Sequence, residues 1–430
     1  MDVQAFAGGF TLGAVQAGLQ LIGKREMVGG FGVRQCEANR RLLGDDWEAE
    51  ACDPADWTPL KADIVISNPP CSGFSVLSHR DFRGASAKIN DCMWHAVEFA
   101  AKCDPTIFIM ESVQVAFRKG LPLMRQLRER LEERTGHRYG LYHVLQDNLS
   151  LGGCSKRPRY FMVCSQVPFG VEAPYLTALP TLGTAIEDLM VMDADEWGPH
   201  QYISPGNWWT NKLRSESGYV DGHYAPSSVG IERLLDLMDH GTGWLEGEAE
   251  ASVARRHQEI NGRLPESWET STRLDGRTRA DWAREKDFNL GMFQVNRWHW
   301  DRPARVVTGA GPTATIHPKL RRFLSHREVA RIMGFPDDWK IEPLKDCREL
   351  GAGWGKGISV HCGEWIAQWA RQSILTMPGE LPYKRVSDFL DAGNELDEYV
   401  LDVSKHWKTV PITDHGPVPV LNQEQEGTAA

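Results

Sequence analysis

Residues 2–13 read DVQAFAGGFTLG, a short apolar strand that leads through a glycine-rich turn into a helix. Glycines at such a turn let a ligand approach the backbone, and the helix that follows directs its first N–H groups at the same point. In doubly wound α/β folds this is the place where nucleotides bind. A tight turn without a ligand also explains the glycines, so the rest of the chain must decide.

Short apolar runs alternate with amphipathic stretches over residues 1–167. Strands are predicted at Ile64–Ser67, 106–110 and 160–166, and residues 121–134 repeat apolar side chains at helical spacing amid Arg and Glu. Strands that alternate with helices are typical of a parallel sheet covered by helices. The sequence therefore predicts an α/β fold with a Rossmann-like, doubly wound sheet.

The remaining chain divides by composition and periodicity. Between residues 168 and 300 the periodicity weakens and Gly, Pro, Trp, Asp and Glu accumulate, which indicates a smaller, irregular second domain. Helical patterns return over residues 301–375, at 325–333 and at 361–375, where Ser325 and Glu328 form an expected capping box and Gly334 ends the helix. Residues 376–430 are expected to be a C-terminal extension with a disordered tail.

Composition limits the class of protein. The chain has 430 residues, of which 41% are hydrophobic and 25% charged, as in soluble globular proteins of more than one domain. No apolar run approaches the roughly 20 residues that span a bilayer, and no secretory signal is visible, so a cytoplasmic protein is expected. Nine scattered cysteines without a CxxC pair favour neither disulfides nor a metal site. The formal charge of −10 means that any nucleic-acid site must be a local cationic groove.

The segment SNPPCSGFS, residues 67–75, ends the strand Ile64–Ser67. Its prolines stiffen the loop, so Cys71 is presented at the carboxyl edge of the sheet, where ligands bind. A thiol there can act as a nucleophile, although a free cysteine is more often a small buried hydrophobe. The next strand delivers Glu111 to the same edge, and Arg157 and Arg159 precede the strand at 160–166. Thiol, carboxyl and arginines are thus predicted to converge.

These residues have ordinary structural interpretations when each is taken alone. Glu111 could be an acid at a helix N-terminus, and the two arginines could form a surface pair. Glu26 lies at a separation suited to an acid that ends the second strand and binds ribose hydroxyls, but alone it reads as a solvated surface acid. Their joint occurrence favours a site.

The motifs, in their order, resemble those of DNA (cytosine-5)-methyltransferases. That family runs DLFAGxGG, PPCQxFS, ENV, QxRxR, a variable target-recognition region, RxLTxRExxRxxGFP and GNSV. The matching segments here are residues 2–9, 69–75, 111–113, 155–159, 322–336 and 355–358. The resemblance covers residues 1–371, with 168–300 as the target-recognition domain. It implies the fold of a class I adenosylmethionine-dependent methyltransferase.

The resemblance implies covalent catalysis, because C5 of cytosine is too weak a nucleophile to take an alkyl group unaided. Cys71, as a thiolate, would attack C6, and Glu111 would protonate or hydrogen-bond N3. Arg157 and Arg159 would hold the base and the flanking backbone and favour the thiolate. The target base must be flipped out of double-stranded DNA, at a cost of roughly a few kcal/mol.

The resemblance also implies a site for S-adenosylmethionine and contacts to DNA, in a protein expected to be a monomer without a metal. The positions that match the cofactor site are Gln4, Ala5, Phe6, Gly8, Gly9, Glu26, Asp53, Pro69, Gly355, Lys356 and Gly357. Ser72 and Ser75 are expected at the DNA. Candidate phosphate or guanine contacts in the target-recognition domain, which could instead form surface ion pairs, are Arg255, Arg256, Arg273, Arg277 and Arg279.

The chain departs from the family at several of these positions. Gln4 stands where the family has a cofactor-touching Phe, and Phe6 where it has Gly. Ser72, Ser112 and Ser155 replace Gln, Asn and Gln of the loop motifs. These changes alter the cofactor pocket and the hydrogen bonding of the loop, and they leave the nucleophile in place.

Lys356 is the most informative departure, because it stands on the Asn of GNSV, with Gly357 on its Ser. An unpaired ammonium beside a sulfonium repels it in a partly desolvated site, and a counter-anion would remove that repulsion. The sequence thus favours carboxy-S-adenosylmethionine, whose extra carboxylate pairs with Lys356, and 5-carboxymethylcytosine as product. In the alternative, Lys356 faces solvent or a DNA phosphate and the enzyme methylates cytosine with S-adenosylmethionine.

Other functions remain open. Asn68-Pro69-Pro70 resembles the NPPY loop of amino-methyltransferases, in which an aromatic residue stacks on the flipped base, but Cys71 stands in that place here. A tRNA methyltransferase is a further alternative. A catalytically inactive, DNA-binding paralogue is the non-enzymatic one, and the retained Cys71, Glu111 and Arg157 argue against it.

Overall fold

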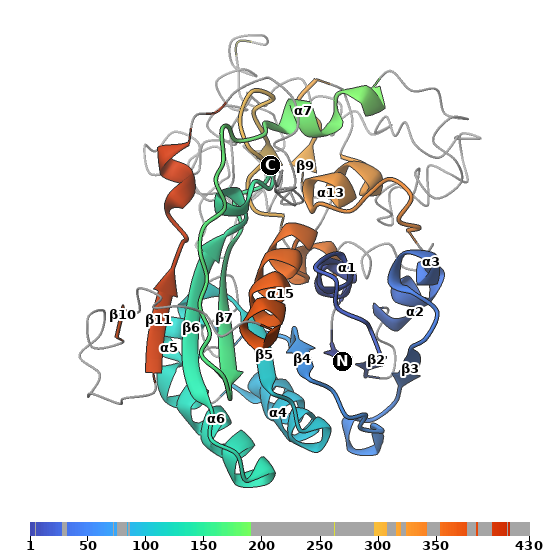
Figure 1. Cartoon of the computed structure of the whole chain (residues 1–430). Coiled ribbons are helices and arrows are strands. Elements are labelled where there is room, and N and C mark those ends of the chain that lie inside the picture. The colour runs from blue at the N-terminus through green and yellow to red at the C-terminus, as the bar shows by residue number, and fades with distance from the viewer. Residues whose placement is uncertain are drawn as a thin grey trace, which may run out of the picture. The chain divides into compact units, whose positions relative to one another are not determined.

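A computed structural model of the protein places a large part of the chain (Figure 1). The described residues are 1–4, 6–27, 32–71, 73–74, 84, 87–190, 262, 296–307, 315–319, 324–341, 353–375, 384–385, 398–410 and 412. Contacts divide the chain into two compact units. The first comprises Met1–Pro180, Met333–Trp339 and Lys356–Ala430, and the second comprises Thr181–Ile332 and Lys340–Gly355.

The first unit is built on a nine-stranded sheet with the order β10-β11-β6-β7-β5-β4-β1-β2-β3. Its strands are β1 (Asp2–Val3), β2 (Gly23–Glu26), β3 (Glu48–Ala51), β4 (Ile64–Ser67), β5 (Ile107–Ser112), β6 (Gly140–Asp147), β7 (Pro158–Ser165), β10 (Lys384–Arg385) and β11 (Glu398–Asp402). Its helices are α1 (Gly9–Gln16), α2 (Gly32–Ala38), α3 (Arg40–Leu43), α4 (Asp91–Cys103), α5 (Gln114–Lys119), α6 (Leu121–Thr135) and α15 (Val360–Leu375).

Strand direction confirms the α/β, doubly wound prediction. The neighbours β3, β2, β1, β4 and β5 pair in parallel, and β7 enters antiparallel between β5 and β6. Chain order reverses between β1 and β4, because β2 and β3 lie on one side of β1 and β4 and β5 on the other. In open α/β sheets, ligands bind at the carboxyl ends of strands beside such a reversal. The fold therefore places the site at the edge where β1 and β4 end.

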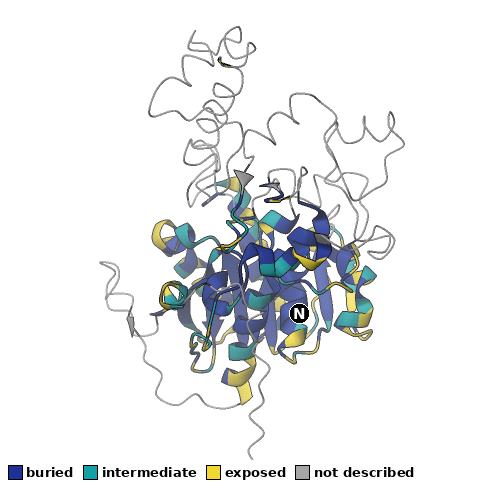
Figure 2. Ribbon diagram, turned by 90° about the horizontal axis from the view of Figure 1, so that it is seen from above, coloured by how far each residue is buried: buried dark blue, intermediate teal, exposed yellow. Residues whose placement is uncertain are grey.

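Both faces of the sheet are covered, because strand side chains alternate between two cores. In β5, Phe108 and Met110 join the core formed with α4 and α6, whereas Ile107 and Ile109 join the core formed with α15. These residues are fully buried, and the centre of the ribbon is coloured dark blue for buried residues (Figure 2). Burial on both faces explains why the sequence shows β5 as a continuous apolar run rather than as an alternating pattern.

Helices α1 and α15 lie side by side over one face of the sheet (Figure 1). Their backbones meet at glycines: a Cβ on Gly13 would lie 2.3 Å from Glu364 N, and a Cβ on Gly363 would lie 2.8 Å from Gly9 O. Side chains at these positions would force the helices apart. The glycines of residues 2–13 thus serve helix packing as well as the turn.

Segments distant in sequence complete the first unit. Phe169 is buried in the core with α15, and Trp365 Nε1 donates to Glu172 O at 2.8 Å, which joins residues 168–180 to this unit. Strand β11 pairs in parallel with β6, so part of the C-terminal extension belongs to the sheet. There Glu398 accepts from His143 at 2.8 Å and pairs with Arg125 at 2.8 Å. Residues 413–430, where a tail was expected, lie outside the described residues.

The described part of the second unit includes α7 (Leu182–Ile186), η5 (Asp188–Met190), β8 (Asn296–Arg297), β9 (Thr315–Ile316) and α13 (His326–Ile332). Leu182 N donates to Arg302 O at 2.8 Å, so residues beyond 300 pack with α7. The capping box of α13 is confirmed: Glu328 N donates to Ser325 Oγ at 3.1 Å, and Ser325 N donates to Glu328 Oε2 at 2.7 Å. Gly334 adopts φ 83°, as expected for the residue that ends the helix. The domain boundaries expected from composition stay a prediction.

Within the described ranges, no helix is long and apolar enough to cross a membrane.

Candidate active site

The predicted catalytic residues reach one edge of the sheet. Cys71 follows β4, and Glu111 lies near the end of β5, which pairs in parallel with β4. Arg157 and Arg159 lie at the start of β7, which runs antiparallel to β5, so the beginning of β7 meets the end of β5. Topology therefore gathers residues that are up to 88 positions apart, from 71 to 159.

Glu111 is fully buried and held from two sides. Arg159 Nε lies 2.6 Å from Glu111 Oε1, and Asn68 Nδ2 donates a hydrogen bond to Glu111 Oε2. Burial raises the pKa of the Glu111 carboxyl, and the positive charges of Arg159 and Arg157 oppose that rise. A carboxyl in this setting retains a proton more readily than an exposed one, as a group that protonates a bound base requires.

The Cys71 thiol is half-buried and lies in the field of the same groups. Burial raises its pKa to about 11, and the negative charge of Glu111 adds to the rise. Arg159, the Val113 backbone and the Ser112 hydroxyl act in the opposite direction. The free protein therefore holds this sulfur as a thiol at neutral pH, and its activation depends on the charge state of Glu111.

The two arginines have different surroundings. Arg159 pairs with Glu111, whereas Arg157 is fully buried and donates to Gly357 O. Burial lowers the pKa of Arg157 to about 9, with the nearby Arg159 adding to the effect and Glu111 opposing it. Arg157 thus ties the catalytic edge to the turn at 357, a link across 200 residues that no local sequence signal indicates.

The turn after β1 has an unusual backbone. Gln4 and Phe6 adopt left-handed φ angles of 64° and 45°, and Gly8 adopts φ 91°. Gly9 is required for a different reason, because a Cβ there would lie 2.2 Å from Ile358 O. The residues just after Gly357 therefore lie against the N-terminus of α1, where a bound nucleotide is expected.

Glu26 ends β2 and is 8% exposed. Burial raises its pKa to about 7, while the charge of Lys24 opposes the rise. Lys24 itself is buried and pairs with Asp2 at 3.1 Å. Gly32, at the start of α2, makes room: a Cβ there would lie 2.6 Å from Glu26 Oε2 and 2.6 Å from Phe6 O. The carboxylate of Glu26 and the turn after β1 are therefore close neighbours.

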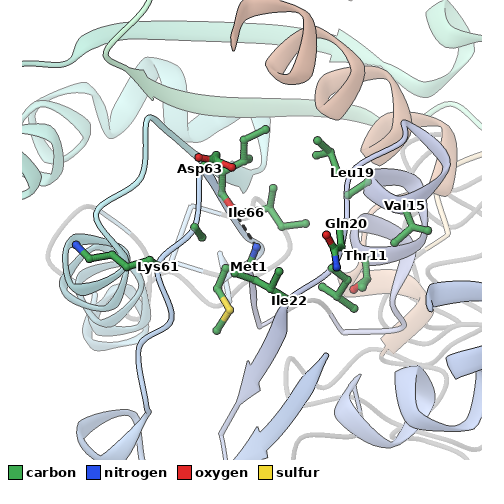
Figure 3. A pocket seen from close by; sticks show the side chains of 13 residues that line it. Met1, Thr11, Val15, Leu19, Gln20, Ile22, Lys61, Asp63 and Ile66 are labelled. Atoms are coloured by element: carbon green, nitrogen blue, oxygen red, sulfur yellow. Dashed lines mark hydrogen bonds between the residues drawn. The ribbon is translucent and has the colours of Figure 1, made fainter. Parts of the chain in front are cut away.

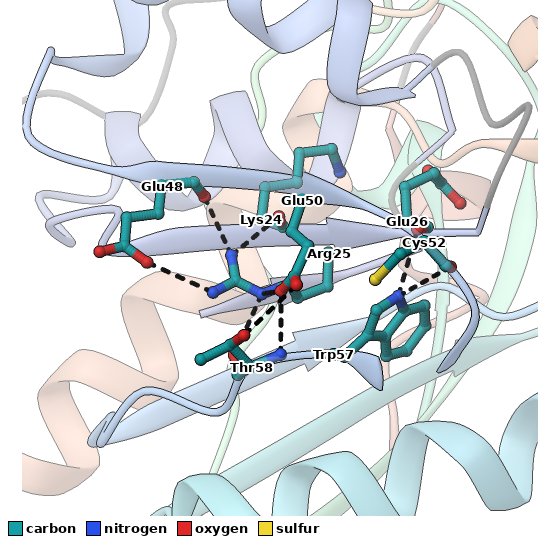
Figure 4. A network of polar contacts seen from close by, with 8 residues as sticks. All are labelled: Lys24, Arg25, Glu26, Glu48, Glu50, Cys52, Trp57 and Thr58. Carbon is teal, nitrogen blue, oxygen red and sulfur yellow. Dashed lines mark hydrogen bonds and ion pairs between the residues drawn. The ribbon is translucent and has the colours of Figure 1, made fainter. Parts of the chain in front are cut away.

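The Trp57 side chain links the ends of β2 and β3 by hydrogen bonds (Figure 4). The sequence did not indicate this role. Its Nε1 lies 3.2 Å from both Glu26 O and Cys52 O. On the same strands, Arg25 forms an ion pair with Glu50 at 2.6 Å, which joins β2 to β3, the outermost strand on this side of the sheet. Asp53, a predicted cofactor contact, is exposed and caps the short helix η1 (Pro54–Asp56) by accepting from Ala55 N at 3.0 Å.

Lys356 is exposed and makes no hydrogen bond or ion pair with the residues that the structure describes. Gly355 is half-buried, Gly357 is buried, and Pro69 is buried after β4. Several predicted site residues lie outside the described residues: Ala5, Ser72, Ser75, Arg255, Arg256, Arg273, Arg277 and Arg279.

Buried polar atoms at this edge fit a polar ligand. Within the described ranges, Gln4 Oε1 and Nε2, Ser67 Oγ and Asn68 Oδ1 have no hydrogen-bond partner. An unpaired buried polar group costs about 1–3 kcal/mol, so such atoms are usually satisfied by a ligand or by water. Together with the acid Glu26, they suit the nucleoside and amino-acid groups of a sulfonium donor.

A separate cavity of about 210 Å³ lies at the amino ends of the strands, whereas Cys71 lies at their carboxyl ends (Figure 3). Met1, Ile22 and Asp63, which precede β1, β2 and β4, contribute to its lining. None of the predicted catalytic residues lines it. The cavity is therefore distinct from the edge that carries Cys71.

The chain is similar to known DNA methyltransferases over most of its length. The family model described as C-5 cytosine-specific DNA methylase matches residues 1–370. Type II methyltransferase M.DdeI of Desulfomicrobium norvegicum is 24% identical over 382 residues, covering 84% of this chain and 83% of that protein. Type II methyltransferase M.XorII of Xanthomonas oryzae pv. oryzae is 24% identical over 366 residues, covering 80% and 78%.

A solved structure supports the fold. It is described as a DNA modification methyltransferase encoded within a prophage of E. coli, with a TM-score of 0.53 and 17% identity, and the match covers 87% of this chain and 98% of that one. The family match extends over the strands that carry Cys71, Glu111 and Arg159 and over the turn at 357. The chain belongs to the C-5 cytosine-specific DNA methylase family.

Proposed function

We propose that the protein transfers an alkyl group to C5 of a cytosine flipped out of double-stranded DNA, through a transient bond between Cys71 and C6. The observation that carries this proposal is that the half-buried Cys71 thiol lies in the electrostatic field of the Glu111–Arg159 ion pair at the carboxyl edge of the sheet. A nucleophile, an acid and a cation at one point are the groups that addition across the 5,6 double bond requires.

The residues act in a fixed order. Cys71 passes its proton to the Glu111 carboxylate and its sulfur bonds to C6, while Glu111, now protonated, gives that proton to N3, so the ring electrons move to C5. Arg159 then stabilises the carboxylate of Glu111. The donor, when bound, supplies the electrophilic carbon that C5 takes. Alkyl transfer releases S-adenosylhomocysteine. Release of the C5 proton to solvent and return of the N3 proton to Glu111 then expel the Cys71 sulfur as a thiolate and restore the aromatic ring, and the thiolate takes its proton back from Glu111.

Gln4, Phe6, Gly8, Gly9 and Glu26 would hold the donor at the ends of β1 and β2. Glu26 would bind the ribose hydroxyls, and its raised pKa favours a carboxyl that can either accept or donate there. The glycine turn lets the donor approach the backbone. Arg157 would link this side of the site to the catalytic edge, because it binds Gly357 O.

We further propose that the donor is carboxy-S-adenosylmethionine and that the product is 5-carboxymethylcytosine. The turn after Lys356 contacts Arg157 through Gly357 and the N-terminus of α1 through Ile358. Lys356 itself is exposed and forms no ion pair with an acidic side chain among the described residues. Its ammonium can therefore pair with a donor carboxylate. With ordinary S-adenosylmethionine the same ammonium would face a sulfonium without a counter-charge.

Replacing Lys356 by asparagine is expected to reverse the choice of donor. Purified protein is incubated with DNA and both donors at equal concentration, and nucleosides are measured by mass spectrometry. The wild type should yield 5-carboxymethylcytosine in excess, whereas Lys356→Asn should yield 5-methylcytosine, with a shift in the product ratio of about tenfold or more for loss of one charged contact. Lys102→Asn, on the exposed end of α4, should leave the ratio unchanged. Exclusive 5-methylcytosine from the wild type would end the carboxymethyl proposal and leave ordinary cytosine-5 methylation.

A further inference from the structure

Gln4 presents a carboxamide that makes no hydrogen bond with the described part of the chain. Its side chain belongs to a residue that is 2% exposed, and neither Oε1 nor Nε2 has a hydrogen-bond partner among the described residues. The main chain around it is satisfied, because Gln4 N donates to Arg25 O at 3.0 Å and Asn68 N donates to Val3 O at 3.1 Å. The two polar atoms without a partner belong to the side chain of Gln4, and its backbone N–H is bonded.

The backbone at Gln4 is also held in a costly conformation. Its φ of 64° is left-handed, as is that of Phe6 at 45°, and neither residue is a glycine. Such conformations cost on the order of 1–3 kcal/mol each and concentrate where a ligand is clamped. A buried orphan amide and a strained turn coincide at the point where chain order reverses, between β1 and β4.

The position of the turn indicates which ligand it would contact. Glu26 Oε2 and Phe6 O both lie 2.6 Å from the Cβ position of Gly32, so the turn that begins at Gln4 lies beside the acid at the end of β2. Cys71 follows β4, and Glu111 lies near the end of β5. The turn therefore belongs to the part of the site at the ends of β1 and β2, where the alkyl donor would bind, rather than to the part at the ends of β4 and β5, where the cytosine would bind.

We propose that the Gln4 carboxamide hydrogen-bonds directly to the alkyl donor, with Nε2 donating and Oε1 accepting, and that Gln4 is a specificity-determining residue for it. The inference rests on the proposed function, in that it requires a sulfonium donor at this edge. It goes further by assigning a polar contact where the family pattern has an aromatic ring. S-adenosylhomocysteine, the product of methyl and carboxymethyl transfer alike, is a probe that does not depend on which donor is used.

Replacing Gln4 by methionine should have opposite effects on the free and the bound protein. Methionine keeps the length of the side chain and removes both orphan atoms, so the urea midpoint of the free protein should stay the same or rise. The Kd for S-adenosylhomocysteine, measured by isothermal titration calorimetry on the full chain, should rise about tenfold, as expected for loss of one or two hydrogen bonds. Gln4→Asn, which tolerates a left-handed backbone, keeps the amide but displaces it and should also raise the Kd.

Gln146→Met is the matched control. Gln146 is equally buried and its Oε1 also lacks a partner among the described residues, but its Nε2 donates to Cys362 Sγ at 3.1 Å, so methionine there should give a lower urea midpoint than Gln4→Met and leave the Kd unchanged. A Gln4→Met protein that loses stability and binds S-adenosylhomocysteine as the wild type does would show that Gln4 is structural and would overturn the inference alone. A wild type that does not bind S-adenosylhomocysteine at all would overturn both the inference and the proposed function.

Discussion

Replacement of Cys71 by serine is expected to lower the rate of cytosine modification by on the order of 10³-fold or more. A hydroxyl does not reach the anionic form at neutral pH, and the attack on C6 depends on that form. Folding and donor binding should be preserved, because Cys71 is half-buried in a loop after β4 and the donor side of the site is built on β1 and β2. Single-turnover modification of DNA, read by nucleoside mass spectrometry, measures the loss.

Cys92→Ser is the control for this substitution. Cys92 is also half-buried, but it lies in the first turn of α4 and has no part in the proposed chemistry, so its replacement should leave the rate unchanged. Undiminished activity of Cys71→Ser would contradict covalent catalysis and favour the amino-methylation alternative, in which no thiol is needed.

Replacement of Glu111 by glutamine is expected to lower kcat/KM by about 10²–10⁴-fold, the usual contribution of a general acid. The single oxygen of glutamine can still accept from Arg159, and a flipped Asn68 amide can accept from the glutamine NH2, so the local packing should be retained, and a thermal melt of the variant checks this. What glutamine cannot do is hold a transferable proton for N3. Asp56→Asn, on the exposed helix η1, is a control carboxyl-to-amide change that should have no effect.

The pH profile separates this chemical role from a structural one. The pKa values of Glu111 and Cys71 are both raised, that of Cys71 to about 11. At a pH between these two pKa values, the resting protein has Cys71 as a thiol and Glu111 as a carboxylate. The reactive pair, thiolate with protonated carboxyl, contains the same number of protons, so kcat/KM of the wild type should be flat between the two pKa values and fall outside them.

In Glu111→Gln no carboxyl can hold the thiol proton. Its kcat/KM should therefore rise about tenfold per pH unit up to the pKa of Cys71, which is itself lowered because the charge of Glu111 no longer raises it. A variant whose pH profile stays flat and parallel to that of the wild type would contradict proton transfer by Glu111.

Local features of the fold could be predicted from the sequence because neighbouring residues determine them. The strand Ile64–Ser67 ends at its prolines with the bounds expected, and the capping box of α13 depends on Ser325 and Glu328 three residues apart. The convergence of Cys71 and Glu111 followed from the rule that parallel strands end at a common edge, whereas Arg159 reaches that edge because β7 runs antiparallel to β5.

Contacts between distant segments could not be predicted. The pairing of β11 with β6 and the bond from Arg157 to Gly357 join residues that are 200 or more positions apart, and no local pattern encodes them. The orphan amide of Gln4 and the raised pKa of Glu26 arise from burial, which depends on the whole fold. The match to the family's motifs gave the residue types, and the fold gave their charge states.

Covalent capture tests the central claim most directly. Duplex DNA that contains 5-fluorocytosine is incubated with the protein and donor, digested with trypsin, and searched by mass spectrometry for a nucleotide adduct, because fluorine at C5 cannot leave as a proton does and the sulfur stays attached. The predicted result is a stable adduct on the peptide that contains Cys71, absent in Cys71→Ser. Modification of ordinary cytosine DNA without any adduct on the fluorinated DNA, or an adduct on another residue, would contradict it.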